Sequence, residues 1–245
     1  MAAKRGATRP ALSAEDIAFV RALVIHQDAD ILALAKPAGL SSQGGRIATP
    51  TLDELLTAFA KPSGVRPRLI HRLDRGTSGI ILAARSQPAA AFLGKAMMAR
   101  RVKKTYLAIV APGAPKPAAG EIDAALVRQD IGREAFVRVA AAEEPGAQAA
   151  RTRYRTLVAD ADAALVELAP LTGRMHQIRV HLAFRGRPIA GDARYGGALR
   201  LKGVAVERLM LHALALRFPH PAGGEMRLEA PPPEDFSALT ARLGR

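Results

Sequence analysis

Cysteine is absent from this chain of 245 residues. The absence excludes disulfide bonds, thiolate nucleophiles and zinc or iron–sulfur centres held by cysteine. Tryptophan is absent too, and aromatic residues make up only 4% of the sequence. Because 49% of the residues are still hydrophobic, an ordinary core can form from leucine, isoleucine, valine and alanine.

A long apolar run is missing as well. No stretch reaches the roughly 18 consecutive apolar residues of a membrane-spanning helix. The first 11 residues are basic and polar, and they lack the apolar segment of a secretory signal. We therefore expect a cytoplasmic protein that does not associate with a membrane.

Acidic residues are outnumbered, since 22 aspartates and glutamates face 36 lysines and arginines, and the net charge is +14. Such an excess produces a positive field that attracts polyanions. A basic surface that binds nothing is the simpler alternative. At this imbalance the sequence favours nucleic acid as the partner.

The order of the predicted elements is typical of an α+β domain. Helices are predicted over residues 51–60, 88–100 and 174–185, with a short one near the end of the chain. Strands come in runs, without the regular alternation of a parallel α/β fold. They are predicted over residues 22–26, 31–35, 68–73, 79–84, 104–110, 152–158, 165–168 and 209–218. We expect a large mixed, mostly antiparallel sheet flanked by helices.

Two segments stand outside this pattern. Residues 1–12 are predicted to be a disordered basic tail, which leaves residues 13–245 as a single domain. Residues 111–120 are rich in proline, alanine and glycine, so they form a loop and could divide the domain into two lobes.

The most distinctive segment is residues 71–79, with the sequence HRLDRGTSG. It places Asp74 between Arg72 and Arg75, on a turn between two apolar strands. Charges are costly at such a position unless they are paired or used. A nearby arginine would keep Asp74 ionised, as a nucleophile or a base requires. The alternative is a turn held by an Asp–Arg pair, and this segment alone does not exclude it.

A second segment, residues 171–181 with the sequence LTGRMHQIRVH, supports the catalytic interpretation. It puts Arg174, His176 and Arg179 on the first turns of one predicted helix. Positive charge there conflicts with the helix dipole unless an anion lies close. That anion is either RNA phosphate or the carboxylate of Asp74.

His176 and His181, together with Asp192, raise the alternative of a metal-dependent hydrolase. A spacing of five residues turns the two imidazoles about 140° apart on an α-helix, so they do not share a face. The spacing therefore argues against a metal site.

A third segment contains a tyrosine on a predicted strand. Lys104 and Tyr106 are two residues apart, so both point to the same face of the strand. A lone tyrosine in such a place usually belongs to the core or the sheet surface. Its meaning depends on what it faces.

Taken in this order, the segments resemble the RluA-type pseudouridine synthase family. The resemblance covers about residues 22–235, and the tandem of residues 71–79 and 171–181 makes it specific. The matching segments are residues 30–39 (DILALAKPAG), 71–79 (HRLDRGTSG), 104–108 (KTYLA), 172–181 (TGRMHQIRVH), 188–192 (PIAGD) with Tyr195 and Gly196, and 208–213 (RLMLHA).

The resemblance implies the catalytic fold of that family and an isomerase that converts uridine in structured RNA to pseudouridine by flipping the base. It implies no cofactor and no metal. Two departures stand out. Ala35 replaces an asparagine that the family often has before its Lys-Pro pair, and we expect no S4-type RNA-binding domain.

By the same resemblance, Asp74 corresponds to the family's essential aspartate. Tyr106 corresponds to the tyrosine that stacks on the target base and is proposed as a base. Arg179 matches the arginine that pairs with the aspartate, and Arg72 matches the side chain that fills the RNA stack where the uridine leaves. Whether the aspartate attacks as a nucleophile or removes a sugar proton on a glycal route stays open.

Arg174 and His176 are expected to contact the RNA, which is ribosomal RNA, transfer RNA or both. We expect a monomer without an obligate protein partner. A non-catalytic RNA-binding or assembly protein on the same scaffold is the main alternative. It does not explain why Asp74, Tyr106 and Arg179 occur together.

Overall fold

The structure is a computed structural model, and the description covers residues 12–44, 49–132 and 134–244. The tail predicted over residues 1–12 lies outside these ranges apart from Leu12, which packs against the core. In the described part of the chain, no helix is long and apolar enough to cross a membrane.

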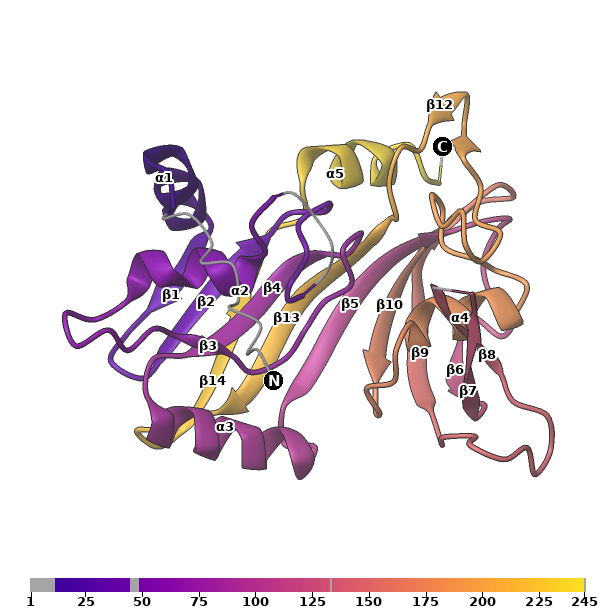
Figure 1. Ribbon diagram of the computed structural model, residues 1–245. Helices are drawn as coiled ribbons and strands as arrows, with labels where there is room; N and C mark the ends of the chain where they lie inside the picture. Colours follow the sequence, from indigo (N-terminus) through magenta and orange to yellow (C-terminus); the bar gives the residue numbers. More distant parts are fainter. Residues whose placement is uncertain (1–11, 45–48, 133, 245) are drawn as a thin grey trace.

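One large sheet runs through the molecule (Figure 1). Its strands are β1 Val24–Gln27, β2 Ile31–Lys36, β3 Arg68–Leu69, β4 Ser78–Ala84, β5 Lys103–Val110, β6 Ala119–Asp123, β9 Arg151–Ala159, β10 Ala164–Pro170, β13 Leu211–Pro219 and β14 Glu225–Glu229. They follow the order β1-β2-β4-β13-β5-β10-β9-β6, with β3 paired to β4 and β14 paired to β13. Among these described pairs only β4 with β13 is parallel. The prediction of an α+β fold around a mixed, mostly antiparallel sheet is confirmed.

Helices flank this sheet at several places (Figure 1). Those described are α1 Ala14–Ala22, α2 Leu52–Leu55, α3 Gln87–Met98, α4 Gln177–Phe184 and α5 Glu234–Thr240, and a 3₁₀ turn, η1 Leu56–Phe59, continues α2. Local signals start them: Ser13 and Asp16 form a capping box at α1, and Ser86 caps α3. The helix predicted over residues 51–60 is α-helical only over Leu52–Leu55 and continues as the 3₁₀ turn η1.

Six strands are not predicted by the sequence. They are β6, β7 Leu126–Ile131, β8 Glu134–Val139, β11 Arg200–Leu201, β12 Val204–Ala205 and β14. Each is only two to six residues long, and β14, with the sequence EMRLE, has just two apolar residues to mark its alternation. The strand predicted over residues 68–73 is wrong after Leu69, because the chain leaves the sheet there and forms a loop.

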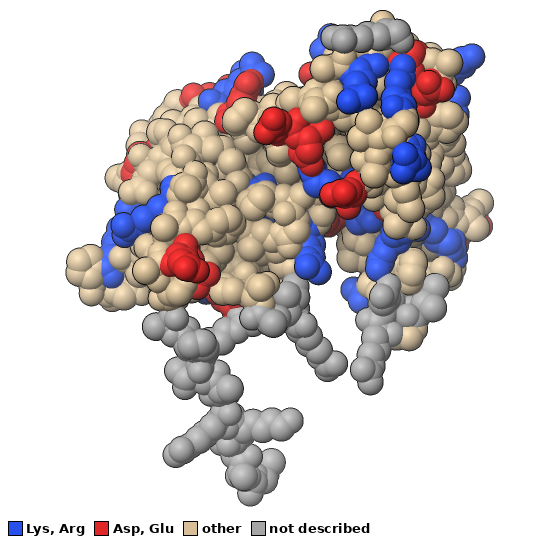
Figure 2. Space-filling view, turned by 90° about the horizontal axis from the view of Figure 1, so that it is seen from above, with Lys and Arg blue, Asp and Glu red and all other residues tan. Residues whose placement is uncertain are grey.

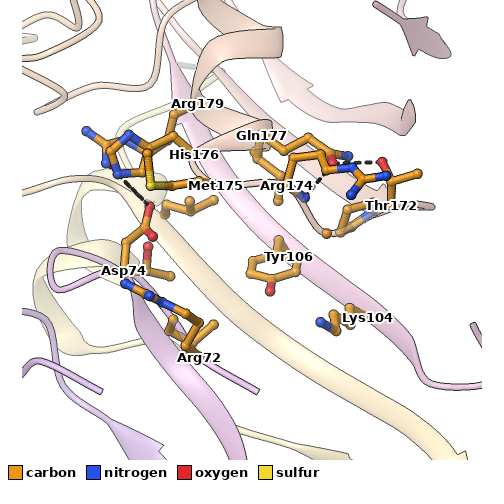
Figure 3. A pocket seen from close by; sticks show the side chains of 16 residues that line it. Arg72, Asp74, Lys104, Tyr106, Thr172, Arg174, Met175, His176, Gln177 and Arg179 are labelled. Atoms are coloured by element: carbon orange, nitrogen blue, oxygen red, sulfur yellow. Dashed lines mark hydrogen bonds and ion pairs between the residues drawn. The ribbon is translucent and has the colours of Figure 1, made fainter. Parts of the chain in front are cut away.

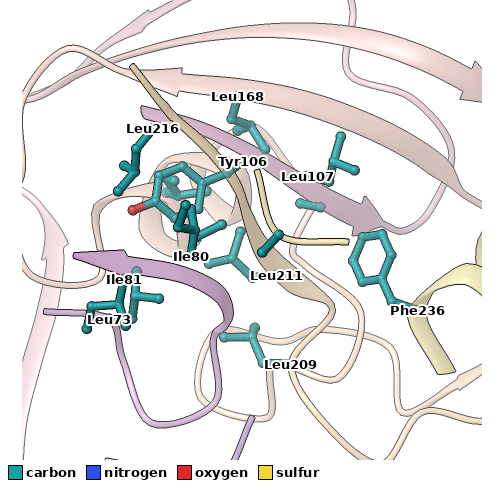
Figure 4. Close-up of a cluster of buried hydrophobic side chains, with 14 of the residues drawn as sticks. Leu73, Ile80, Ile81, Tyr106, Leu107, Leu168, Leu209, Leu211, Leu216 and Phe236 are labelled. Carbon is teal, nitrogen blue, oxygen red and sulfur yellow. The ribbon is translucent and has the colours of Figure 1, made fainter. Parts of the chain in front are cut away.

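The core lies against the central strands of the sheet. Every residue of β4 is buried, as are most residues of β2. Ile80 of β4, Tyr106 of β5 and Leu211 of β13 belong to one apolar cluster (Figure 4). The ring of Tyr106 is therefore part of the rigid interior.

The parallel contact between β4 and β13 requires a very close approach of two backbones. Ser78 pairs with His212 and Gly79 with Ala213. Gly79 has φ +116°, and a Cβ atom on it would lie 2.2 Å from the carbonyl oxygen of Ala213. The buried Ser78 Oγ lies 3.0 Å from Nδ1 of His212, whose Nε2 lies 3.0 Å from the carbonyl oxygen of Ala230. These contacts fix the start of β4, directly after the loop that carries Asp74.

We predict that Gly79→Ala lowers the free energy of unfolding by about 3 kcal/mol or more, because it combines overpacking with an unfavourable positive φ. Gly94→Ala in α3 is the matched control: no atom lies within 4 Å of its added Cβ, so it should raise stability by about 0.5–1 kcal/mol. Urea unfolding of both variants measures the difference. Equal stabilities would show that the β4–β13 contact adapts to a side chain.

Candidate active site

Asp74 lies on the loop between β3 and β4, and the loop that follows β2 holds the backbone next to it. Ser42 Oγ donates to the carbonyl oxygen of Leu73 at 2.7 Å and accepts the Leu73 N–H at 3.0 Å. Inside the loop, the Thr77 N–H donates to the carbonyl oxygen of Asp74 at 3.0 Å. The backbone on both sides of the carboxylate is thus fixed.

Lys36 reinforces this support from a buried position at the end of β2. Its Nζ donates to the carbonyl oxygens of Pro37, Leu40 and Arg75 at 2.9, 2.8 and 3.4 Å. Three acceptors match the three N–H groups of an ammonium. Burial lowers the pKa of Lys36 to about 7, and the negative charge of Asp74 opposes that shift.

The two arginines that flank Asp74 in the sequence have different positions. The Nε of Arg75 donates to the carbonyl oxygen of Gly39 at 2.9 Å, so Arg75 ties the two loops together. Arg72 instead lines the pocket beside Asp74 (Figure 3). An ion pair between Asp74 and a flanking arginine is not among the described contacts.

Arg179 supplies the cation that faces Asp74. Its Nη1 lies 3.4 Å from Oδ2 of Asp74. A stronger contact is the bidentate pair with Asp192, in which Nε and Nη2 each donate at 2.7 Å. The side chain of Asp192 is only 1% exposed. Because that pair fixes the guanidinium, its remaining N–H groups have a set direction towards Asp74.

His176 also lies beside the carboxylate of Asp74, with its Nε2 3.7 Å from Oδ2. Its Nδ1 lies 2.8 Å from the hydroxyl of Tyr195, which accepts the Val137 N–H. Burial lowers the pKa of His176, and the charge of Asp74 opposes the shift. When Tyr195 donates to Nδ1, the proton of the neutral imidazole lies on Nε2, facing Asp74.

Helix α4 begins later than the sequence predicts. The predicted helix starts at residue 174, but α4 starts at Gln177, and His176 before it has φ +54°. The Gln177 side chain accepts from the N–H of Arg174 and from Thr172 Oγ1, so the preceding residues form a loop instead of a first turn. Arg174 and His176 are consequently loop residues at the helix entrance, and the prediction that they lie on its first turns is wrong.

His181 faces away from Asp74. Its ring nitrogens lie 2.9 Å from Thr152 Oγ1 and 3.0 Å from the carbonyl oxygen of Ala124. Thus the two histidines of the metal alternative have separate protein partners. Within the residues that the structure describes, no group of three histidine or acidic side chains could hold a metal ion.

A pocket of about 220 Å³ brings the predicted site residues together (Figure 3). Asp74 and His176 lie at one end, whereas Lys104, Thr172 and Arg174 lie at the other, with Tyr106 between them. All six residues predicted for the site line it: Arg72, Asp74, Tyr106, Arg174, His176 and Arg179. Asp74 is the only acidic residue among the described lining residues.

Burial shifts the pKa values of two polar side chains that line the pocket, Tyr106 and Lys104. Burial raises the pKa of Tyr106, and the charge of Asp74 raises it further, so its phenol stays protonated at neutral pH. Burial also lowers the pKa of Lys104. Figure 2 shows lysine and arginine side chains on both sides of a notch between two halves of the molecule.

Several residues that shape the site are not predicted from the sequence. Asp192 and Tyr195 hold Arg179 and His176, and Ser42 and Lys36 hold the loop of Asp74. Lys36, Asp192 and Tyr195 fall in short segments that resemble the family, and the sequence raises Asp192 only as a possible metal ligand. Ser42 has no such signal.

Comparisons with known proteins show what this chain is similar to. The family described as RNA pseudouridylate synthase matches residues 30–184. The Ribosomal large subunit pseudouridine synthase C of Escherichia coli (strain K12) is 36% identical over 236 residues, which are 94% of this chain and 72% of that protein. The protein of the same name from Vibrio vulnificus (strain CMCP6) is 34% identical over 241 residues, 96% of this chain and 74% of that protein.

Two solved structures are similar to this chain over most of its length. Human RNA Pseudouridylate Synthase Domain Containing 4 has a TM-score of 0.76 at 28% identity, covering 94% of this chain and 98% of that one. Human RNA Pseudouridylate Synthase Domain Containing 1 has a TM-score of 0.72 at 28% identity, covering 90% of this chain and 86% of that one.

We predict that Asp192→Asn lowers the free energy of unfolding by about 3–5 kcal/mol, because it leaves a buried guanidinium without its main counter-charge. The matched control is Asp130→Asn, since Asp130 is 63% exposed in its pair with Arg128 and should change stability by about 1 kcal/mol or less. Denaturant unfolding compares the two. A small effect at Asp192 would mean that Arg179 is held by other groups.

Proposed function

This chain belongs to the RNA pseudouridylate synthase family. From that premise we propose that it converts specific uridines of large-subunit ribosomal RNA to pseudouridine, with Asp74 as the catalytic carboxylate. Members of the family isomerise uridine to pseudouridine in RNA. The substrate is proposed from the names of the relatives, which act on the large ribosomal subunit.

The observation that carries the proposal is the position of Asp74. It is the only carboxylate among the described lining residues of the pocket, and Arg179 lies 3.4 Å away. A neighbouring guanidinium favours the ionised form of a carboxylate. Asp74 and this guanidinium lie together at one end of the pocket (Figure 3), where we place the target sugar.

The reaction asks for little beyond such side chains. The bond between N1 and C1′ of uridine breaks, the uracil turns, and a bond between C5 and C1′ forms. C5 loses a proton and N1 gains one, so the nucleoside is neither oxidised nor reduced. Acid–base and nucleophilic groups are sufficient for this chemistry.

A uridine inside folded RNA must first leave its stack, which costs a few kcal/mol. Arg72 is exposed at the pocket rim, where it can fill the gap and meet phosphate. Tyr106 offers a ring face to the flipped base from a position fixed by the core. Arg174 and His176 line the same pocket and supply further contacts to the RNA.

Two routes use the same arrangement. In one, Asp74 attacks the nucleoside, and in the other it removes a sugar proton to give a glycal. Both routes use Asp74 as an anion, and the guanidinium of Arg179 lies beside it. Tyr106 has a raised pKa, so its phenol must lose its own proton before it can accept the one from C5.

The experiment is a map of pseudouridine in ribosomal and transfer RNA from cells with and without this gene. We expect one or more large-subunit positions to lose the modification and to regain it with the wild-type gene. Asp74→Asn should fail to restore them, because loss of the anion should slow the reaction by at least about 100-fold. Asp130→Asn, which changes an exposed carboxylate that does not line the pocket, should restore them fully.

Two results would contradict the proposal. Restoration by Asp74→Asn would show that another group performs the chemistry. An unchanged map in the deletion strain, with folded protein that binds RNA, would favour a non-catalytic RNA-binding or assembly protein.

A further inference from the structure

A second cavity, of about 360 Å³, adjoins the active-site pocket. The end of α3, the connection to β5 and the loop over residues 170–174 line it. Lys104, Thr172 and Arg174 line both cavities. These three residues lie at the end of the active-site pocket that is remote from Asp74 (Figure 3). The two cavities therefore share a wall.

The lining of this second cavity is positively charged. Arg100, Lys103, Lys104 and Arg174 contribute cations, and no acidic residue is among the described lining residues. Arg100 and Lys103 are exposed and form no ion pair with any described residue. Unpaired cations around a cavity match an anionic ligand.

An apolar surface lies beside these cations. Met98 is 79% exposed, although methionine is usually buried, and Met97, Val102 and Leu171 also line the cavity. Methionine has a flexible, polarizable side chain that adapts to a flat ligand. A ligand that fits has both an anionic group and an apolar face.

We propose that this second cavity binds the nucleotide adjacent to the target uridine, with its phosphate on Arg100 and Lys103 and its base against Met98. The inference rests on the proposed function, because a strand whose uridine enters the first pocket must continue past its rim. Cationic grooves with apolar platforms are how proteins hold unpaired RNA. The shared wall of residues 172–174 would then separate two successive nucleotides.

Crosslinking tests the position directly. Met98 is replaced by the photoreactive p-benzoylphenylalanine, and the full-length protein is irradiated with a transcript of the ribosomal RNA fragment that contains the mapped uridine. We expect crosslinks at the nucleotide next to that uridine. The same replacement at Phe19, which is 44% exposed on α1, is the matched control and should give none there. Crosslinks from position 98 only to distant nucleotides would overturn the proposal.

Salt dependence tests the phosphate contact. Arg100→Gln with Lys103→Gln should reduce the slope of log affinity against log salt by about 0.7 for each phosphate contact removed. The double variant Arg21→Gln with Lys61→Gln, which removes two exposed cations elsewhere, is the control. It should leave this slope nearer to the wild-type value. An equal decrease of this slope in both double variants would show that Arg100 and Lys103 act only as part of the general surface charge. That result would overturn the proposal.

The two proposals fail in different ways. Pseudouridine formation without a crosslink at position 98 would overturn the second cavity and leave the function intact. A crosslink from position 98 without any pseudouridine would overturn the function and leave an RNA site.

Discussion

The geometry of the site depends on one buried ion pair, between Arg179 of α4 and Asp192 of the loop that follows this helix. Buried ion pairs are often no more stable than apolar side chains of similar volume. The value of this pair is geometric: it uses two N–H directions of the guanidinium and leaves the third for Asp74, 3.4 Å away. The same loop brings Tyr195 to His176, so two groups that face the carboxylate share one support.

Asp74 is held differently from the other side. Ser42 and Lys36 bind backbone groups of its loop, not the carboxylate itself. The carboxylate therefore keeps its acceptor capacity for a ligand while its position is fixed. Tyr106, in the core, provides a wall whose orientation no surface loop can change.

The sequence predicts the residues that line the pocket better than it predicts the residues that support them. Asp74, Tyr106 and Arg179 stand in segments whose residue order is distinctive, and all three line one pocket. Ser42 and Lys36 act through contacts between a side chain and a backbone 31 and 39 residues away, and no local pattern encodes such contacts. The start of α4 is missed for a related reason, because the Gln177 side chain replaces a helical turn with a loop. Strands such as β14 are missed since an exposed edge needs few apolar residues.

The strand order also determines when this site can exist. The loop of Asp74 leads into β4 and Tyr106 lies on β5, yet the strand between β4 and β5 is β13, from residues 211–219. A growing chain acquires Asp74, Tyr106 and Arg179 well before it acquires the strand that separates their supports. Pairings this distant in sequence form late in folding, because loop closure must precede them. The pocket of Asp74 can therefore form only after β13 has been synthesised and inserted into the sheet.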